Sequence, residues 1–225
     1  MKIYINYLFT RIIYIIARIR KPIIKNLLIR LFVNFYKINT DELTKKCPHE
    51  YKTLNDFFIR ELATEARKID YSENNIISPV DGTISAAGKI EENLIIQAKN
   101  LNYSLEDLLV TDDFSIKPFI NGSFATIYLA PHNYHRVHAP ISGFLDQISY
   151  VPGSLLSVNS QNTKKIPKLF VRNERLICHF DTDIGPIKLI FVGALNVGSI
   201  STIWTGTIRP KYKGIIEHLK IQNIR

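Results

Sequence analysis

The sequence contains little cysteine and nothing that separates it into independent modules. Cys47 and Cys178 lie far apart without Cys-x-x-Cys spacing, which argues against a disulfide framework or a zinc knuckle and favours a reduced, cytoplasmic setting. Internal repeats, low-complexity tracts and Gly/Ser linkers are also missing from the 225 residues. We therefore expect one continuous unit, consisting of a domain of ordinary size with a small helical appendage.

Long hydrophobic runs are missing as well. In the N-terminal arm, residues 1–40, the longest uncharged run covers only residues 3–10, whereas a membrane-spanning helix needs roughly 18 or more apolar residues. Charges interrupt any signal-peptide core, and no small-residue cleavage site follows. The arm is therefore expected neither to cross a membrane nor to be a cleaved signal.

Acidic residues are absent from this arm, although the whole chain has 20 of them against 29 basic residues. The other 21 basic residues nearly balance the acidic ones, so the net charge of +9 is concentrated at the N-terminus. Large apolar side chains separate the charges, which predicts a basic amphipathic helix pair, broken near Pro22, on an anionic membrane surface. Nucleic-acid binding is disfavoured because phosphate contacts do not need so many apolar residues; a plain core helix is the other alternative. The basic residues of the arm are Lys2, Arg11, Arg18, Arg20, Lys21, Lys25, Arg30 and Lys37.

The hydrophobic pattern predicts an α+β fold. Two or three helices are expected in residues 1–66, the last over residues 53–66 with Thr53 as N-cap. After Asp70, short apolar runs alternate with Gly, Pro and Asn turns, which is typical of a mainly antiparallel β domain. One helix is expected to interrupt this domain at residues 104–109, with Ser104 as its cap.

The segment YLAPHNYHRVHAPISG at residues 128–143 has the densest group of ionisable side chains. Its Val and Tyr residues predict a strand or strand edge. Side chains then alternate, so His132 and His138 share one face and His135 points to the other. The spacing of the three histidines also allows a zinc site, but alternation separates them and no Cys or carboxylate ligand is close in sequence.

Several motifs of the chain occur together in a specific order and spacing. These motifs are SPVDG at residues 78–82, QAKNLNYSLEDLL at 97–109, the histidine segment at 128–143, YVPGSLLSVN at 150–159 and RNER at 172–175. With these motifs, which are together highly specific, the chain resembles the β-chain portion of a pyruvoyl-dependent phosphatidylserine decarboxylase of the prokaryotic type. The resemblance runs from about the first residues to Arg209.

The resemblance implies three catalytic residues. Asp81 matches the aspartate and His138 the histidine of a self-processing Asp-His-Ser triad, in which the aspartate orients the imidazole and the imidazole takes the serine proton. His135 matches a second active-site histidine, which would position substrate or transfer a proton during decarboxylation. From sequence alone, the favoured interpretation of Asp81 is a turn residue before Gly82, and the resemblance reverses that preference. Asn133 stands where the family commonly has Asp, which is expected to lower the basicity of the histidines.

One family feature does not occur in the sequence. In the family, a precursor cleaves itself at a Gly-Ser-Thr tripeptide, and the serine becomes the pyruvoyl cofactor at the start of an α-chain. The Gly-Ser pairs here end at Ser123, Ser154 and Ser199, and none is followed by threonine. The cofactor serine is therefore expected on a separate α-chain segment, and the 225-residue chain alone is expected to be inactive.

The resemblance implies decarboxylation of phosphatidylserine to phosphatidylethanolamine, with residues 1–66 as a helical, membrane-associating region and 67–225 as the mainly β catalytic domain. Expected partners are anionic membrane lipids, the phosphatidylserine substrate and the pyruvoyl α-chain, without metal or nucleic acid; a homodimer of αβ units is compatible. The expected location is peripheral, on the cytoplasmic side of the cell membrane. The alternatives are a catalytically dead, membrane-binding remnant and a serine hydrolase that uses Asp81, His138 and an internal serine such as Ser123.

Overall fold

The computed structural model describes residues 2–72, 75–111, 116–211 and 214–224. They form two compact units, and each unit combines stretches that are distant in sequence. We call the first the sheet unit; it comprises Met1–Arg11, Ala86–Ala125 and Gly143–Arg225. The second, the histidine unit, comprises Ile12–Ser85 and Thr126–Ser142. The functional division after residue 66 is a separate matter and stays a prediction.

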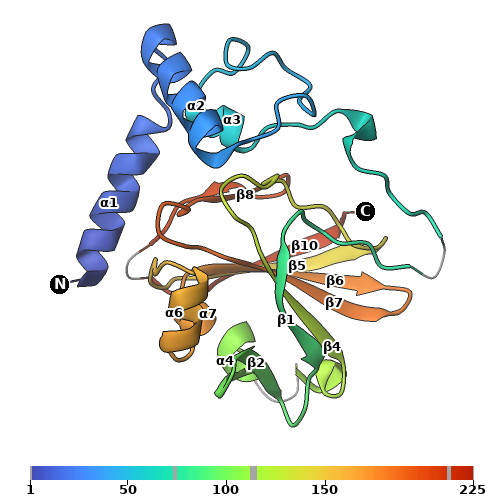
Figure 1. Ribbon diagram of the computed structural model, residues 1–225. Coiled ribbons are helices and arrows are strands. Elements are labelled where there is room, and N and C mark those ends of the chain that lie inside the picture. The colour runs from blue at the N-terminus through green and yellow to red at the C-terminus, as the bar shows by residue number, and fades with distance from the viewer. Residues whose placement is uncertain (1, 73–74, 112–115, 212–213, 225) are drawn as a thin grey trace. The chain divides into compact units, whose positions relative to one another are not determined.

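A four-stranded antiparallel sheet with the order β10-β5-β6-β7 is the centre of the sheet unit. Its strands are β5 (Phe144–Val151), β6 (Arg175–Thr182), β7 (Gly185–Val192) and β10 (Glu217–Ile224), drawn side by side in Figure 1. A two-residue turn joins β6 to β7, and Gly185 closes it with a φ of +110°, a value that favours glycine. The expected antiparallel β architecture is thereby confirmed.

Buried apolar side chains lie on both faces of this sheet. Neighbouring residues of one strand contribute to different faces, because successive side chains point to opposite sides. Val151 and Ile177 belong to a buried cluster that also contains Ile95, Tyr103 and Leu108. Ile148 and Cys178 belong to a second cluster on the other face. Cys178 is a free thiol, and burial raises its pKa to about 12, so it is inert at neutral pH.

A hairpin and a short helix cover part of the first cluster. The hairpin is formed by β2 (Leu94–Ala98) and β3 (Leu101–Ser104), and α4 (Leu105–Leu109) follows directly. The Ser104 hydroxyl accepts a hydrogen bond of 3.1 Å from the amide of Asp107, which is the geometry of a helix N-cap. The predicted capped helix at 104–109 is confirmed.

Arg175 on β6 ties this helix to the sheet. Its side chain is 2% exposed and donates hydrogen bonds to the carbonyls of Asp107 and Leu108 at the end of α4. It also donates to the carbonyl of Val171 in α7 (Leu169–Arg172) and to that of Asn173. Four carbonyls at helix ends thus compensate a buried charge without a carboxylate.

The remaining elements are short. Strands β8 and β9 form one two-stranded sheet, and β1 and β4 form another. The bounds are β1 (Thr83–Lys89), β4 (Ser123–Tyr128), β8 (Ile200–Thr202), β9 (Gly206–Ile208), η2 (Lys117–Phe119) and α6 (Ser160–Lys165).

The N-terminal arm forms two helices, α1 (Lys2–Ile16) and α2 (Pro22–Tyr36), so the predicted break near Pro22 is confirmed. Proline favours the first helical position because its missing N–H is not needed there. Within the sheet unit, the Tyr7 hydroxyl of α1 donates to the Gly153 carbonyl at 2.5 Å and the Asn6 amide donates to that of Leu155 at 3.1 Å. Among the described residues, no helix is long and apolar enough to cross a membrane.

Helix α2 packs its inner face into the core of the histidine unit. Ile29, Ile38, Tyr51 and Phe57 are the buried members of this core. Phe57 comes from α3 (Leu54–Phe58), whose N-cap is Thr53; its side chain accepts a hydrogen bond of 3.0 Å from the Asp56 amide. The predicted N-cap is confirmed.

The predicted helix over residues 53–66 is wrong beyond Phe58. After α3 the chain is irregular, and only a short turn, η1 (Thr64–Ala66), follows. Leu62 instead forms an isolated antiparallel bridge with Leu43, and the Ala63 amide donates to the Glu42 carbonyl at 2.8 Å. Pairing with a distant segment has overridden the local helical spacing.

Candidate active site

The histidine segment between Tyr128 and Gly143 is irregular, so the predicted strand is wrong. A turn opens it: the Asn133 amide donates to the Ala130 carbonyl at 2.9 Å, and the Asn133 side chain accepts from the Ala130 amide at 2.7 Å. Nη2 of Arg60 donates hydrogen bonds to the carbonyls of His132 and Asn133, at 2.7 and 3.1 Å. These bonds fix the segment by side chains and turns in place of a strand ladder.

His135 is a half-buried, neutral imidazole. Its ring lies against Phe58 of α3, with the ring centroids 4.0 Å apart. Its pKa is lowered to about 4, chiefly by burial and to a smaller extent by the charge of Arg60, while a hydrogen bond with the Asn133 carbonyl raises it in part. Since that bond, 2.8 Å long, assigns the proton to Nδ1, Nε2 is left with a free lone pair.

His138 is exposed, and its imidazole pairs with Tyr134. The Tyr134 hydroxyl lies 3.0 Å from His138 Nε2, and the two rings are stacked at 5.6 Å. With the hydroxyl as donor, Nε2 is the acceptor nitrogen and Nδ1 carries the proton. The His138 amide donates to the Pro79 carbonyl at 2.9 Å. Sequence reasoning gave Tyr134 no role, although a tyrosine four residues before a candidate base is visible in the sequence.

Asp81 follows Pro79 by two residues, so the same backbone hydrogen bond brings the SPVDG and histidine segments together. Its carboxylate accepts from Arg67, at 2.8 Å from Nε and 2.6 Å from Nη2. Arg67 also bonds Glu42 at 3.1 Å. In the described part of the chain the carboxylate bonds Arg67, and it makes no hydrogen bond with His138. A side chain at Gly82 would meet Ile127 and the Tyr128 carbonyl at 2.7 Å, which explains the glycine.

Asp81 borders a cavity of about 240 Å³ in the histidine unit. Residues of both charge signs line it: the basic Lys37, Arg60 and Arg67 and the acidic Glu42 and Asp81. The other lining residues are Ile38, Asn39, Leu62, His132, Asn133 and Tyr134. The predicted site residue Asp81 and the Tyr134 partner of His138 therefore border the same space.

The three histidines do not converge. His132 and His138 are exposed, His135 packs on Phe58, and His138 pairs with Tyr134. Among the residues the structure describes, no group of three His, Cys, Asp or Glu side chains is placed to hold a metal ion. The arrangement offers acid–base chemistry by an imidazole and a phenol beside a carboxylate.

A sequence model described as phosphatidylserine decarboxylase matches residues 54–217, a range that includes Asp81 and the histidine segment. The chain belongs to the phosphatidylserine decarboxylase family. The proenzyme of Escherichia coli O9:H4 (strain HS) is 51% identical over 191 residues, which cover 85% of this chain and 59% of the relative. That of Citrobacter koseri (strain ATCC BAA-895 / CDC 4225-83 / SGSC4696) is 49% identical over 201 residues, covering 89% and 62%. The chain thus spans about three-fifths of the length of these relatives.

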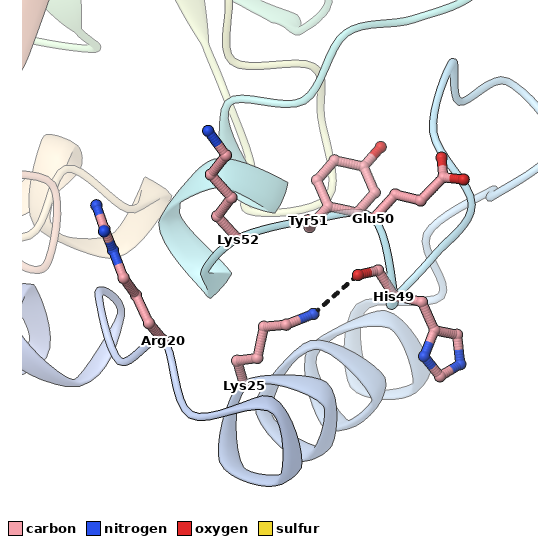
Figure 2. A pocket seen from close by; sticks show the side chains of 6 residues that line it. All are labelled: Arg20, Lys25, His49, Glu50, Tyr51 and Lys52. Atoms are coloured by element: carbon pink, nitrogen blue, oxygen red, sulfur yellow. Dashed lines mark hydrogen bonds between the residues drawn. The ribbon is translucent and has the colours of Figure 1, made fainter.

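This member of the decarboxylase family has a second, basic hollow of about 330 Å³ where α2 begins. Figure 2 shows its lining residues Arg20, Lys25, His49, Glu50, Tyr51 and Lys52. The Lys25 amine is buried and donates to the carbonyls of Pro48 and His49 and to the Asn26 side chain. Lys25 therefore anchors a loop, whereas Arg20 and Lys52 are exposed.

Proposed function

We propose that this chain is the β-chain part of a self-processing decarboxylase that converts phosphatidylserine to phosphatidylethanolamine with a pyruvoyl-bearing α-chain segment. The observation that carries the proposal is the family match over residues 54–217, together with the backbone bond from His138 to Pro79 that joins the two matching motifs. A homodimer of αβ units and a position on the cytoplasmic side of the cell membrane belong to the same proposal.

The side chains near Asp81 fit self-processing at a serine. That reaction needs a neutral imidazole with an open acceptor nitrogen and a group that holds its other nitrogen. The acceptor nitrogen of His138, Nε2, is hydrogen-bonded to the Tyr134 hydroxyl. A serine hydroxyl would replace the Tyr134 hydroxyl as the donor to Nε2 during processing. Asp81 would accept a hydrogen bond from the Nδ1–H of His138, and Arg67 would hold the carboxylate in position.

His135 fits the later, decarboxylating step. The pyruvoyl group supplies a carbonyl that accepts the electron pair left when carbon dioxide departs. With a pKa of about 4, the His135 imidazole is neutral at pH 7. It can therefore accept a hydrogen bond at Nε2 without placing a positive charge beside Arg60, whereas accepting a proton there would form the imidazolium that burial and Arg60 disfavour.

The test is to extend the chain after Arg225 with the C-terminal segment of the E. coli relative that contains Gly-Ser-Thr. The extended protein should split into two chains, and vesicles with carboxyl-labelled phosphatidylserine should release labelled carbon dioxide. The 225-residue chain should release none, because general acid–base help is worth about 10²–10⁴-fold and cannot replace the electron-accepting carbonyl.

Two outcomes would favour the alternatives. Lipid binding by an extended chain that neither splits nor decarboxylates would indicate a dead remnant. Labelling of the 225-residue chain by a fluorophosphonate, lost in a Ser123→Ala variant, would indicate a serine hydrolase.

We also propose that residues 1–40 dock the protein on anionic membranes. A stripe of exposed side chains with i, i+4 spacing follows one side of α2: Ile23, Leu27, Leu31 and Phe35, each 56–86% exposed. Exposed Arg20 and Lys21 lie beside its first turn. An apolar stripe flanked by basic residues is the pattern of an interfacial helix.

Removing either part of this surface should weaken binding to vesicles of phosphatidylcholine and phosphatidylglycerol. Arg20→Gln with Lys21→Gln should reduce partitioning at least about tenfold at low salt, since each charge near the surface is worth roughly 1 kcal/mol. Leu27→Gln with Leu31→Gln should weaken sedimentation at high salt too. Lys164→Gln with Lys165→Gln, an exposed pair on α6, is the charge-matched control. Unchanged sedimentation after deletion of residues 1–40 would place the membrane surface elsewhere.

A further inference from the structure

Arg60 is a buried cation whose hydrogen-bonding capacity is only partly used. Arg60 is 4% exposed, and its Nη2 donates hydrogen bonds to the His132 and Asn133 carbonyls. Its guanidinium carbon lies 5.3 Å from the centre of the Phe57 ring. Nε and Nη1 have no hydrogen-bond partner among the described residues. Unpartnered donors of a buried charge are costly, and a water, an ion or a ligand is the kind of partner that would satisfy them.

Arg60 also has no carboxylate within ion-pair distance in the described part of the chain. The two acidic residues of its cavity, Glu42 and Asp81, are both bonded to Arg67. The pKa of Arg60 is lowered by burial, although Tyr51, Glu42 and Asp81 offset part of this effect. The guanidinium nevertheless stays charged, as it does in proteins generally. A positive charge is therefore held in a poorly solvated place, and none of the described carboxylates forms an ion pair with it.

The cavity of about 240 Å³ that Arg60 lines has room for a small anionic group. Lys37 lines the same cavity, is exposed, and makes no ion pair among the described residues. The orphaned nitrogens of Arg60 are sealed from water, so solvent screens little of the attraction that their charge exerts on an anion in the cavity.

We propose that this cavity is an oxyanion subsite that binds the phosphodiester of a glycerophospholipid headgroup, with Arg60 as its buried cation and Lys37 at its entrance. The assignment rests on the proposed function and names the part of the substrate that this site takes. A carboxylate has the same oxyanion chemistry, but a buried arginine on the departing carboxylate would stabilise the substrate against reaction. The phosphodiester is unchanged by decarboxylation, so its binding energy is kept throughout.

Binding to the 225-residue chain can be measured by calorimetry with soluble probes: glycerophosphoserine, glycerophosphoethanolamine, inorganic phosphate and L-serine. Glycerophosphoserine and glycerophosphoethanolamine should bind with similar affinity, and L-serine should not bind. Arg60→Lys keeps the charge but loses the planar fork, and should weaken both by about tenfold. Arg136→Lys, the same change at an exposed arginine paired with Glu61, is the matched control.

A second variant covers the case that Arg60→Lys does not fold. Lys37→Gln alters an exposed side chain and should weaken both glycerophosphodiesters several-fold. In the extended, processed protein it should raise KM with little change in kcat, since binding common to substrate and transition state acts on KM.

Three results would overturn the subsite: binding of L-serine alone, tighter binding of inorganic phosphate than of either phosphodiester, or phosphodiester affinities unchanged in Lys37→Gln and in any Arg60→Lys protein that folds. An extended chain that binds glycerophosphoserine through Lys37 but releases no carbon dioxide would sink the proposed function and leave the subsite standing. An extended chain that decarboxylates, with a KM that Lys37→Gln leaves unchanged, would support the proposed function and overturn the subsite.

Discussion

The extended chain, with a relative's Gly-Ser-Thr segment after Arg225, should split into two chains, while its Asp81→Asn and His138→Ala variants should remain whole. His138→Ala removes the acceptor of the serine proton, and Asp81→Asn removes the group that orients the imidazole and stabilises its protonated form. Losses of about 10³-fold or more are expected, because members of such a constellation act as a unit. Denaturing electrophoresis and intact-mass spectrometry measure the result directly.

Controls follow from the contacts of the site. His132→Ala removes an exposed histidine of the same segment, of which Arg60 binds only the backbone carbonyl, and it should split normally. Glu42→Gln removes the other carboxylate bonded to Arg67. It shows whether loss of an Arg67 ion pair alone affects splitting, as opposed to loss of the triad aspartate. His135→Ala should split but decarboxylate poorly. A His138→Ala chain that splits at the parental rate would disprove the triad assignment.

Loss of stability between pH 4.5 and pH 8 is expected from the buried carboxyl of Glu174, in the RNER motif. Glu174 is 1% exposed and lies against Gly193, where an added Cβ would meet its Oε1 at 2.7 Å. Burial raises its pKa to about 7, although a hydrogen bond of 2.9 Å from the Tyr150 hydroxyl lowers it in part. The folded state therefore keeps a proton that the unfolded state loses.

The direction of the pH effect on stability follows from the difference in proton binding between the folded and unfolded states. Between the ordinary pKa of 4.5 and the raised value of about 7, the folded state binds more protons than the unfolded one. The contribution of Glu174 to the free energy of unfolding should then fall as pH rises through this window, by about 3 kcal/mol. Below the window the carboxyl is protonated in both states, and its contribution no longer changes.

Glu174→Gln isolates this effect, because the amide is neutral at every pH and can still accept from Tyr150. Denaturant unfolding at several pH values should show the variant gaining about 3 kcal/mol on the parent between pH 4.5 and pH 8. Glu65→Gln changes an exposed glutamate in η1 and should give a pH-independent difference. Parallel pH profiles for the parent and Glu174→Gln would show that the carboxyl is not buried as described.

The sequence by itself determined the family, the α+β class and the helix caps. The motifs agree in order and spacing, which is information carried by the chain alone, and the later match over residues 54–217 confirms it. Ser104 and Thr53 were predictable as N-caps because a cap acts on an amide three residues away. The break before Pro22 was predictable for the same local reason.

Tertiary structure alone decided how the candidate site is held. The histidine segment was predicted as a strand from its composition, but Arg60, more than 70 residues away in sequence, binds its carbonyls and keeps it irregular. The helix from Thr53 ends at Phe58 because the following residues pair with the segment around Leu43. The contact of Arg67 with Asp81 and the inward position of Lys25 carry no sequence signal of their own. Such contacts depend on which distant backbone groups and charges need a partner once the chain is folded, and local periodicity does not contain that information.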